Sequence, residues 1–312
     1  MNNSYYPSKS IKTIEELSKV LDETEDTLNS VSINLPIYYK KNVLLKKDGG
    51  KRTTYIVKGI LKRIQQKIKN RILDRVCFAE YLFFGIKKRN GIIENAKYHC
   101  KWGKPKALLS FDIKNFYPSV TENQIKNIWV NFFKFSEAVA ILLTKLTAFL
   151  NELPQGVSTS VLISNLIFFE SEKLLAQRIR KYNANYSRYA DDISITFKKG
   201  YTQKDLSEAI RLVVYFIGNS GFKLNWKKFK ITTTKNPMVT NKSVCINNGY
   251  LSLNPSKRKE AYSRLKKYKS SIKTKKNINS DFEYQKLIGY LRFCYSINPH
   301  KEIKKFINEA VI

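Results

Sequence analysis

The sequence predicts an α+β protein in which short strands and amphipathic helices alternate along the chain. Residues 193–197 alternate apolar and polar side chains, which is the period of a half-buried strand. Residues 58–72 carry an isoleucine at every fourth position among lysines and arginines, which is typical of an amphipathic helix. A basic helical stretch is expected from Asn254 onward. With 312 residues the chain can bury a large core and form two or three compact regions.

The chain is strongly basic along its whole length. Lys and Arg number 57 against 25 Asp and Glu, a net charge of +32, and 13% of the residues are aromatic. This combination indicates a polyanionic partner such as RNA or DNA. The alternative is a lysine-rich protein that binds no nucleic acid and reflects only the base composition of its genome.

Cysteine usage and hydropathy exclude several other classes. The four cysteines have no paired spacing, so the sequence predicts neither a zinc site nor a disulfide framework. The polar N-terminus lacks a signal-peptide core, and no apolar run is long enough to cross a bilayer. A cytoplasmic protein with no membrane partner is therefore expected.

The N-terminal part is expected to contain a helix and then a basic hairpin. Residues 11–32 are predicted to be helical, with Thr13 as the candidate cap. Lys46–Arg52 is a glycine turn between strand-like runs at 42–45 and 53–57. Such a tip presents backbone N–H groups and cations together, which suits a triphosphate or a nucleic-acid backbone. Asp-Gly-Gly is, however, also a common hairpin turn.

The remaining elements are expected in a mixed order. An apolar strand at 107–113 carries one acid, Asp112, which is costly there unless it is paired or binds a metal. Ser119 or Thr121 is the candidate cap of the helix that follows. Helices are expected at 122–150, 158–175 and 202–219, strands at 222–225, 230–234, 243–246 and 250–253, a polar segment at 90–99 and a loop at 102–105.

Two adjacent carboxylates stand out in the segment Tyr189-Ala190-Asp191-Asp192, between strand-like runs on either side. A strand-turn-strand unit holds both acids at a tight bend, where their like charges repel. A divalent cation is the usual relief for such a pair. The alternative is an ordinary hairpin turn, in which Asp is common.

Together with Asp112, these acids form a candidate catalytic set. Three carboxylates that converge on two magnesium ions are the arrangement that nucleotidyl transfer needs. One ion lowers the pKa of the attacking hydroxyl, and the other neutralises charge on the triphosphate and the leaving pyrophosphate. The sequence therefore predicts a two-magnesium site at Asp112, Asp191 and Asp192.

Five segments follow one another in an order that resembles the motifs of reverse transcriptases. They are Lys46–Arg52, Asp112–Tyr117, Leu153–Gly156, Tyr189–Asp192 and Gly221–Lys228. The resemblance runs from about residue 40 to the C-terminus and implies a right-hand polymerase fold with fingers, an antiparallel palm sheet and a helical thumb. It implies an N-terminal helical extension at 1–40, fingers at 41–105 and 120–155, palm at 106–119 and 156–245, and a basic thumb or RNA-recognition region at 246–312.

The resemblance also implies roles for individual residues. Asp112 and Asp191 would be the main metal ligands, helped by Asp192 and the Ile113 carbonyl. Tyr117 would be a steric gate against a ribose 2′-OH, and Gln155 and Gly156 would contact the incoming sugar and base. Tyr189 would support the primer terminus. Lys51 and Arg52 would bind the triphosphate, and Lys228 would protonate pyrophosphate. The alternatives are core packing for Tyr117 and an ordinary surface lysine for Lys228.

Two segments resemble the retron subgroup. Asn95-Ala-Lys-Tyr-His99 matches an Asn-Ala-x-x-His pattern, and Val239-Thr240-Asn241 matches Val-Thr-Gly except at its third residue. The resemblance implies that these segments bind RNA. Asn is the non-glycine residue that best tolerates a left-handed backbone. The alternative for His99 is a hydrogen-bonded structural histidine.

A second departure lies at Ser158 and Val161, where the family often has prolines. We expect it to change only the start of the helix.

A retron enzyme would copy part of a structured non-coding RNA into single-stranded DNA from dNTPs. The resemblance implies priming from a guanosine 2′-OH of that RNA, which gives a branched RNA–DNA product, and an anti-phage effector protein as a further partner. The basic stretch 254–312 would bind an RNA stem-loop. No RNase H, maturase or endonuclease domain is expected after it.

Two rivals remain open. One is a group II intron-like or abortive-infection reverse transcriptase with another primer. The other is a degenerate palm-fold RNA-binding protein, against which the three acids argue.

Overall fold

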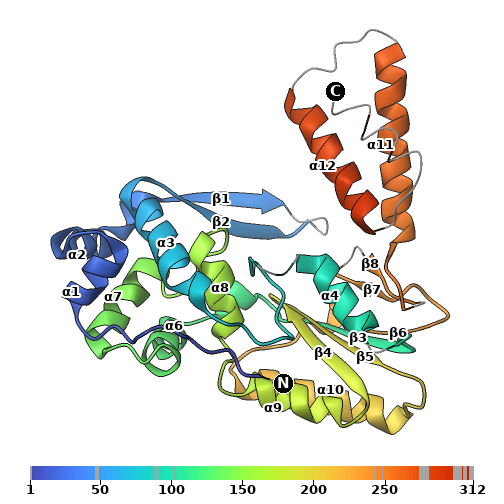
Figure 1. Cartoon of the computed structure of the whole chain (residues 1–312), viewed down its shortest axis with the longest axis horizontal. Helices are drawn as coiled ribbons and strands as arrows, with labels where there is room; N and C mark the ends of the chain where they lie inside the picture. Colours follow the sequence, from blue (N-terminus) through green and yellow to red (C-terminus); the bar gives the residue numbers. More distant parts are fainter. Residues whose placement is uncertain are drawn as a thin grey trace.

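A four-stranded antiparallel sheet forms the centre of the protein. The computed structural model describes residues 2–45, 49–87, 89, 91–101, 103–241, 244–247, 249–273, 281–297, 304 and 308. The strands of this sheet are β3 (Ala107–Asp112), β4 (Ala184–Tyr189), β5 (Asp192–Phe197) and β6 (Lys230–Thr233), in the spatial order β4-β5-β3-β6. The expected hairpin between β4 and β5 is confirmed, and β3 lies between β5 and β6 (Figure 1).

Strand β5 is buried on both faces, so the expectation of a half-buried strand was wrong. Ile193 and Ile195 pack with α9 (Glu172–Arg180) and α10 (Gln203–Asn219) in the main core. The opposite face carries Ser194 and Thr196, which are only 5% and 2% exposed. Helix α4 (Gly91–Cys100) covers that face, and it forms from the polar segment for which no helix was expected. Polar side chains on a central strand therefore mark a second covered face.

The N-terminal region is a helical layer beside a two-stranded hairpin. The hairpin pairs β1 (Tyr39–Leu45) with β2 (Lys51–Val57), and residues 46–48 of the predicted tip lie outside the described residues. Helix α3 (Gly59–Arg71) follows and buries its isoleucine stripe, as expected. Residues 11–32 form two helices, α1 (Ile14–Leu21) and α2 (Glu25–Ile33), rather than one, because Asp22 takes a left-handed backbone. Thr13 caps α1, as predicted. Short 3-10 turns lie at Leu35–Tyr38 and Leu73–Arg75.

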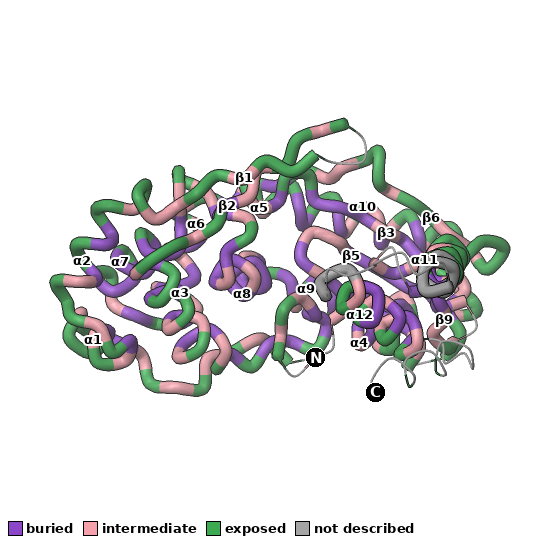
Figure 2. The backbone as a smooth tube through the Cα atoms, turned by 90° about the horizontal axis from the view of Figure 1, so that it is seen from above, coloured by how far each residue is buried: buried purple, intermediate pink, exposed green. Residues whose placement is uncertain are grey.

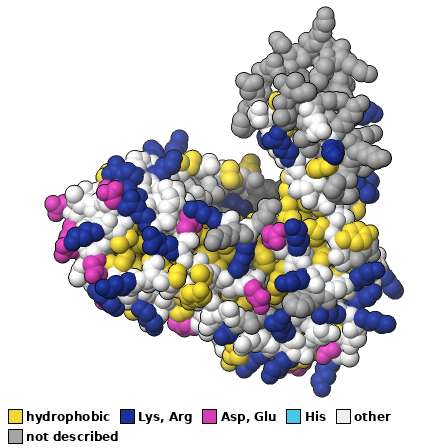
Figure 3. All heavy atoms as spheres, viewed as in Figure 1, with side chains coloured by type: hydrophobic (Ala, Val, Ile, Leu, Met, Phe, Trp, Pro, Cys, Tyr) yellow, Lys and Arg dark blue, Asp and Glu magenta, His cyan; other side chains and the backbone are white. Residues whose placement is uncertain are grey.

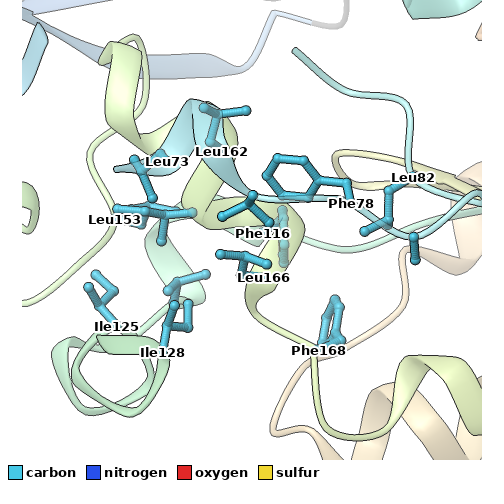
Figure 4. Close-up of a cluster of buried hydrophobic side chains, with 14 of the residues drawn as sticks. Leu73, Phe78, Leu82, Phe116, Ile125, Ile128, Leu153, Leu162, Leu166 and Phe168 are labelled. Atoms are coloured by element: carbon cyan, nitrogen blue, oxygen red, sulfur yellow. The ribbon is translucent and has the colours of Figure 1, made fainter. Parts of the chain in front are cut away.

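The helical region after β3 is more broken than the sequence indicated. A single turn, α5 (Phe116–Ser119), precedes α6 (Glu122–Asn127), a π-helical segment (Ile128–Phe132) and α7 (Glu137–Thr147). Thr121 is the cap, through a capping box with Gln124. The expected helix at 158–175 is likewise divided, into α8 (Ser158–Leu166) and α9. Figure 4 shows side chains from these separate pieces gathered around Phe116.

The C-terminal part begins with a small sheet and ends in two helices. The strands are β7 (Val239–Thr240), β8 (Val244–Cys245) and β9 (Ser252–Leu253), and the helices are α11 (Pro255–Lys273) and α12 (Asp281–Ile297). The expected strand at 222–225 makes only one bridge, between Leu224 and Ile113, and is followed by a 3-10 turn at Trp226–Lys228. Helices α11 and α12 share a second core with α4. They project from the molecule on the same side as the β1–β2 hairpin (Figure 1), and buried residues run through both cores (Figure 2).

Across the described residues, none of the helices combines the length and the apolar character that spanning a bilayer would take.

His99 ties helix α4 to the central sheet. Its ring nitrogens lie 2.8 Å from the Thr196 hydroxyl and 2.7 Å from the Ser187 hydroxyl, on adjacent strands. The side chain is buried, and this burial lowers the pKa of His99 to about 3. The histidine is thus held in its neutral form inside the protein.

This burial predicts a stability that depends on pH. The folded-state pKa of about 3 lies below the ordinary value of 6.5, so the unfolded chain takes up the proton first as pH falls. The free energy of unfolding should therefore drop by about 2 kcal/mol between pH 7 and pH 5 through His99 alone. Urea denaturation of the wild type and His99→Gln at both pH values measures this difference. Parallel pH dependences in the two proteins would contradict it.

Candidate active site

The register of the central sheet brings the three predicted acids to one end. Asp112 ends β3 directly opposite Asp192, the first residue of β5. Asp191 lies in the two-residue bend that joins β4 to β5, and its carbonyl accepts a hydrogen bond of 2.9 Å from the Ile113 amide. Ala190, the other residue of the bend, has a φ of 56°. A left-handed backbone costs a residue other than glycine about 1–2 kcal/mol, so surrounding contacts must hold this bend in place.

Asp112 is nearly buried and is held by two side chains from the segment after α10. Its carboxylate accepts hydrogen bonds from Lys228 Nζ at 2.7 Å and from Asn225 Nδ2 at 3.2 Å. The Asn225 amide also donates to the Asp112 carbonyl at 2.8 Å. Partial burial alone would lower the pKa of Lys228, but the hydrogen bond to Asp112 and the charges of Asp112, Asp191 and Asp192 together raise it. Lys228 therefore carries its proton at neutral pH.

The oxygen atoms at this end of the sheet are of the kind that binds a hard cation, although they do not form a closed set of metal ligands. Within the described part of the chain, no three His, Cys, Asp or Glu side chains form a ready-made metal site. The carboxylates of Asp112 and Asp191 and the Ile113 carbonyl are nevertheless the oxygen donors that magnesium prefers. A cation at Asp112 would compete with Lys228 for the same carboxylate.

One pocket of about 440 Å³ joins this end of the sheet to the β1–β2 hairpin. Its lining includes most of the residues with a predicted catalytic, metal-binding or substrate-binding role, namely Lys51, Arg52, Asp112, Ile113, Tyr117, Gln155, Asp191 and Lys228, but not Gly156, Tyr189 or Asp192. The acids thus lie across the pocket from cations that are far away in the sequence. Such an arrangement can bind a ligand that carries both a metal ion and phosphate groups.

The pocket also contains residues that sequence reasoning missed. Side chains alternate along a strand, so Lys51 and Tyr55 share one face of the hairpin, and Lys41 joins them because it pairs with Tyr55. Arg52 starts from the opposite face. The strand period at 39–45 could have identified Lys41, and the Gly221–Lys228 motif already contained Asn225.

The turn at Leu153–Gly156 is fitted closely against strand β2. The Tyr55 amide donates to the Gln155 carbonyl at 2.7 Å. Gly156 has a φ of 96°, and a Cβ atom there would lie 3.0 Å from the Tyr55 carbonyl oxygen. A side chain at position 156 would therefore push the hairpin away, so this glycine fixes the wall of the pocket. Ser158 begins α8, at one of the two departures from the family pattern, and the helix forms there without proline.

Tyr117 is half-buried and lines the pocket. Its ring packs against Phe116, and its hydroxyl is hydrogen-bonded to Ser164. Burial raises the pKa of Tyr117 to about 12, with a smaller contribution from the charge of Asp191. The side chain thus packs on the core and also presents an edge to the pocket, so the two roles considered for it are compatible.

Tyr189 lies at the end of β4, directly opposite Asp192. Its ring meets that of Phe84 edge-on at 4.9 Å. Burial raises its pKa, with a contribution from the charge of Asp192.

A second groove of about 640 Å³ runs along the sheet beyond Asp112. Its lining includes Asp112, Asp192, Lys228, Val239 and Asn241. The two segments that resemble retron motifs meet beside it, where Asn95 Nδ2 donates to Asn241 Oδ1 at 2.8 Å. Asn241 has a φ of 47°, which confirms the expected left-handed backbone.

Three other residues of these two segments are turned inward. Asn95 and Thr240 are each 1% exposed, and His99 is engaged by the sheet. In this structure, Val239 and Asn241 are therefore the members of the two motifs that reach the groove.

Known proteins that are similar to this chain belong to the family whose motifs line this site. Residues 44–278 match the family model described as reverse transcriptase (RNA-dependent DNA polymerase). The retron Se72 reverse transcriptase of Salmonella heidelberg is 30% identical over 236 residues, which are 75% of this chain and 61% of that protein. The retron Ec73 reverse transcriptase of Escherichia coli is 29% identical over 274 residues, which are 84% of each.

The relatives differ in length, and this chain spans less than two thirds of the Se72 protein. Among solved structures, the RNA-dependent RNA polymerase of BmCPV at elongation state has a TM-score of 0.42 and 12% identity, over 80% of this chain and 26% of that one. The fold assignment does not depend on it. The family match and the antiparallel sheet confirm the right-hand polymerase fold and the resemblance to retron-type enzymes: the chain belongs to the reverse transcriptase family.

Proposed function

We propose that this chain is the RNA-directed DNA polymerase of a retron, which copies part of a structured non-coding RNA into single-stranded DNA. The observation that carries the proposal is the single pocket in which the acids of β3 and the β4–β5 bend face the cations of β1 and β2. The family match and the retron relatives support it. We assign fingers, palm and thumb to the ranges expected from the sequence.

The family implies a divalent metal cofactor, and we propose two magnesium ions held by Asp112, Asp191 and the Ile113 carbonyl, with Asp192 as a third acid. When bound, the ions would activate the attacking hydroxyl and neutralise phosphate charge. Lys51 and Arg52, with Lys41, would hold the triphosphate of a dNTP, while Tyr117, Gln155 and Gly156 would border its sugar and base. Lys228 would hold a proton at Nζ for the leaving pyrophosphate, and Tyr189 would support the primer terminus.

The RNA partner would be bound mainly through its phosphates. Lysine and arginine side chains are scattered across the visible described surface, where acidic side chains are fewer (Figure 3). We propose that the basic region from Asn254 onward binds a stem-loop of the cognate RNA, and that Val239 and Asn241 contact nucleic acid along the second groove. Priming from a 2′-OH of that RNA, a cytoplasmic location and an effector protein of an anti-phage system are further parts of this proposal.

An intron-like reverse transcriptase with another primer would share this pocket, so chemistry alone does not distinguish it. A degenerate RNA-binding palm is disfavoured because Asp112, Asp191 and Asp192 all occupy one end of the sheet.

The decisive experiment examines nucleic acid that co-purifies with the protein when it is expressed with its native flanking locus. After RNase digestion we expect one discrete single-stranded DNA that retains a 2′-linked ribonucleotide. Asp191→Ala should abolish it, because this variant removes a main metal ligand while most of the pocket remains. Heterogeneous DNA, or normal primer extension without such a product, would support the polymerase activity but reject the assignment to a retron. Absence of metal-dependent dNTP incorporation on any RNA template would reject both.

Sugar discrimination tests Tyr117. Replacing it with Ala opens the pocket beside the sugar, so the ratio of kcat/KM for dNTPs to that for rNTPs should fall about 10²-fold or more. Tyr117→Phe is the matched control, because it keeps the ring and removes only the hydroxyl. Single-nucleotide incorporation with each substrate gives both ratios. Unchanged discrimination in the Ala variant would leave Tyr117 as a packing residue only.

Single-turnover kinetics tests Lys228. Lys228→Ala should slow the chemical step by about 10²-fold and leave the apparent dNTP affinity nearly unchanged, because a general acid acts in the transition state. Lys227→Ala, which removes the same charge one residue away, is the control. A variant that loses affinity but keeps its maximal rate would argue against the proton-donor role.

A further inference from the structure

The two most completely buried charged side chains among the described residues form an ion pair, which the sequence does not predict. Arg188 lies in β4 and Glu172 begins α9, and their side chains are 0% and 2% exposed. The guanidinium holds the carboxylate with two hydrogen bonds, Nε to Oε1 at 2.6 Å and Nη2 to Oε2 at 2.8 Å. Tyr186 adds a hydrogen bond of 2.7 Å to the same carboxylate.

The remaining donors of Arg188 all go to backbone carbonyls. Nη1 donates to Ser164 at 3.0 Å and to Ala190 at 3.2 Å, and Nη2 donates to Asn165 at 2.9 Å. A guanidinium has five N–H groups, so every one of them is used. Ser164 and Asn165 lie near the C-terminal end of α8, where carbonyls lack helical partners and a positive charge is favourable.

These contacts connect the two parts of the pocket that must be aligned. Ala190 immediately precedes Asp191 in the bend and has the strained left-handed backbone. Ser164 is also the hydrogen-bond partner of Tyr117. One planar group thus fixes the bend that carries Asp191 to the helix that supports Tyr117.

A stabilising role alone does not account for this arrangement. Removing two charges from water is so costly that apolar residues of the same volume often stabilise a protein equally well. A planar group with five fixed donors does, however, provide geometry that an apolar pair lacks.

We infer that Arg188 and Glu172 are positioning residues, which hold the Ala190–Asp191 bend so that the Asp191 carboxylate faces Asp112. The inference rests on the proposed function, because the carboxylate that they orient is the proposed metal ligand. Neither residue touches the pocket, so neither is itself catalytic.

The test uses Arg188→Met combined with Glu172→Leu, and separately Arg188→Lys. The double variant removes both charges and keeps apolar volume, so it should fold. Arg188→Lys keeps the charge beside Glu172 and loses the fork that reaches Ala190 and Ser164. We expect both variants to lower kcat for single dTTP addition on an RNA template with a DNA primer by about 10²-fold, because small misplacements cost that much. The KM for primer–template should be unchanged.

A second readout does not depend on activity. Calorimetric titration with Mn²⁺ should show affinity at least about tenfold weaker in both variants than in the wild type, with Asp191→Ala as the reference for a lost site. The matched control is Arg63→Met combined with Glu23→Leu, an ion pair between α3 and the α1–α2 turn, which should change neither measurement.

The outcomes are distinct. A folded double variant, or a folded Arg188→Lys protein, with wild-type kcat and wild-type Mn²⁺ affinity would overturn the inference. If the double variant does not fold, Arg188→Lys decides by the same two measurements. A wild type without incorporation would reject the proposed function instead, and the Mn²⁺ titration would still judge the positioning role.

Discussion

The antiparallel pairing of β3 with β5 is the constraint on which the rest of the structure depends. It sets Asp112 opposite Asp192 and leaves Asp191 in the adjoining bend. Carboxylates so close together repel, and the site needs compensation before any ligand arrives. Lys228 provides it at Asp112, and the raised pKa of this lysine shows that all three acids contribute to holding its proton. Asp112 and Asp191, at this end of the sheet, line one pocket together with the cations of β1 and β2.

Two kinds of charge pairing therefore coexist around the bend, and they differ in exposure. The Lys228 side chain is 45% exposed, so a competing cation or phosphate can reach it and replace its contact with Asp112. Arg188 and Glu172 are closed to solvent, and no ligand can compete for them. The exchangeable pair lies at the acidic end of the sheet, and the permanent pair lies behind it and holds the backbone of the bend through the Ala190 carbonyl. This division is the physical basis for treating Lys228 as a participant and Arg188 as a support.

The sequence is sufficient to predict that the three acids share one end of the sheet. It is not sufficient to predict which residues hold the bend of Asp191 in place. The β4–β5 hairpin, the strand of Asp112 and the order of motifs follow from periodicity and spacing, which are local signals. The helix break at Asp22 depends on a left-handed backbone at a residue other than glycine, which carries little local signal. Arg188 and Glu172 are polar residues 16 positions apart, and only the packing of α9 on β4 shows that they are buried together. The sequence is compatible with two roles for His99 for the same reason, since its partners lie on strands far along the chain.

The departure at Asn241 illustrates how such long-range contacts can offset a local cost. A left-handed backbone favours glycine, and asparagine at this position is less favourable by a fraction of the roughly 1–2 kcal/mol that other residues lose. The Asn241 side chain accepts a hydrogen bond from the buried Asn95 amide, and such a bond contributes about 0.5–1.5 kcal/mol. The Asn241 Nδ2 atom, however, is buried and has no hydrogen-bond partner among the described residues, which costs about 1–3 kcal/mol. The bond to Asn95 therefore offsets only part of the cost of the substitution. It also adds a tie that glycine cannot make, between helix α4 and the small sheet beside the second groove. In this chain the two segments that resemble retron motifs are therefore coupled through their side chains, so a substitution in either segment should also affect the other.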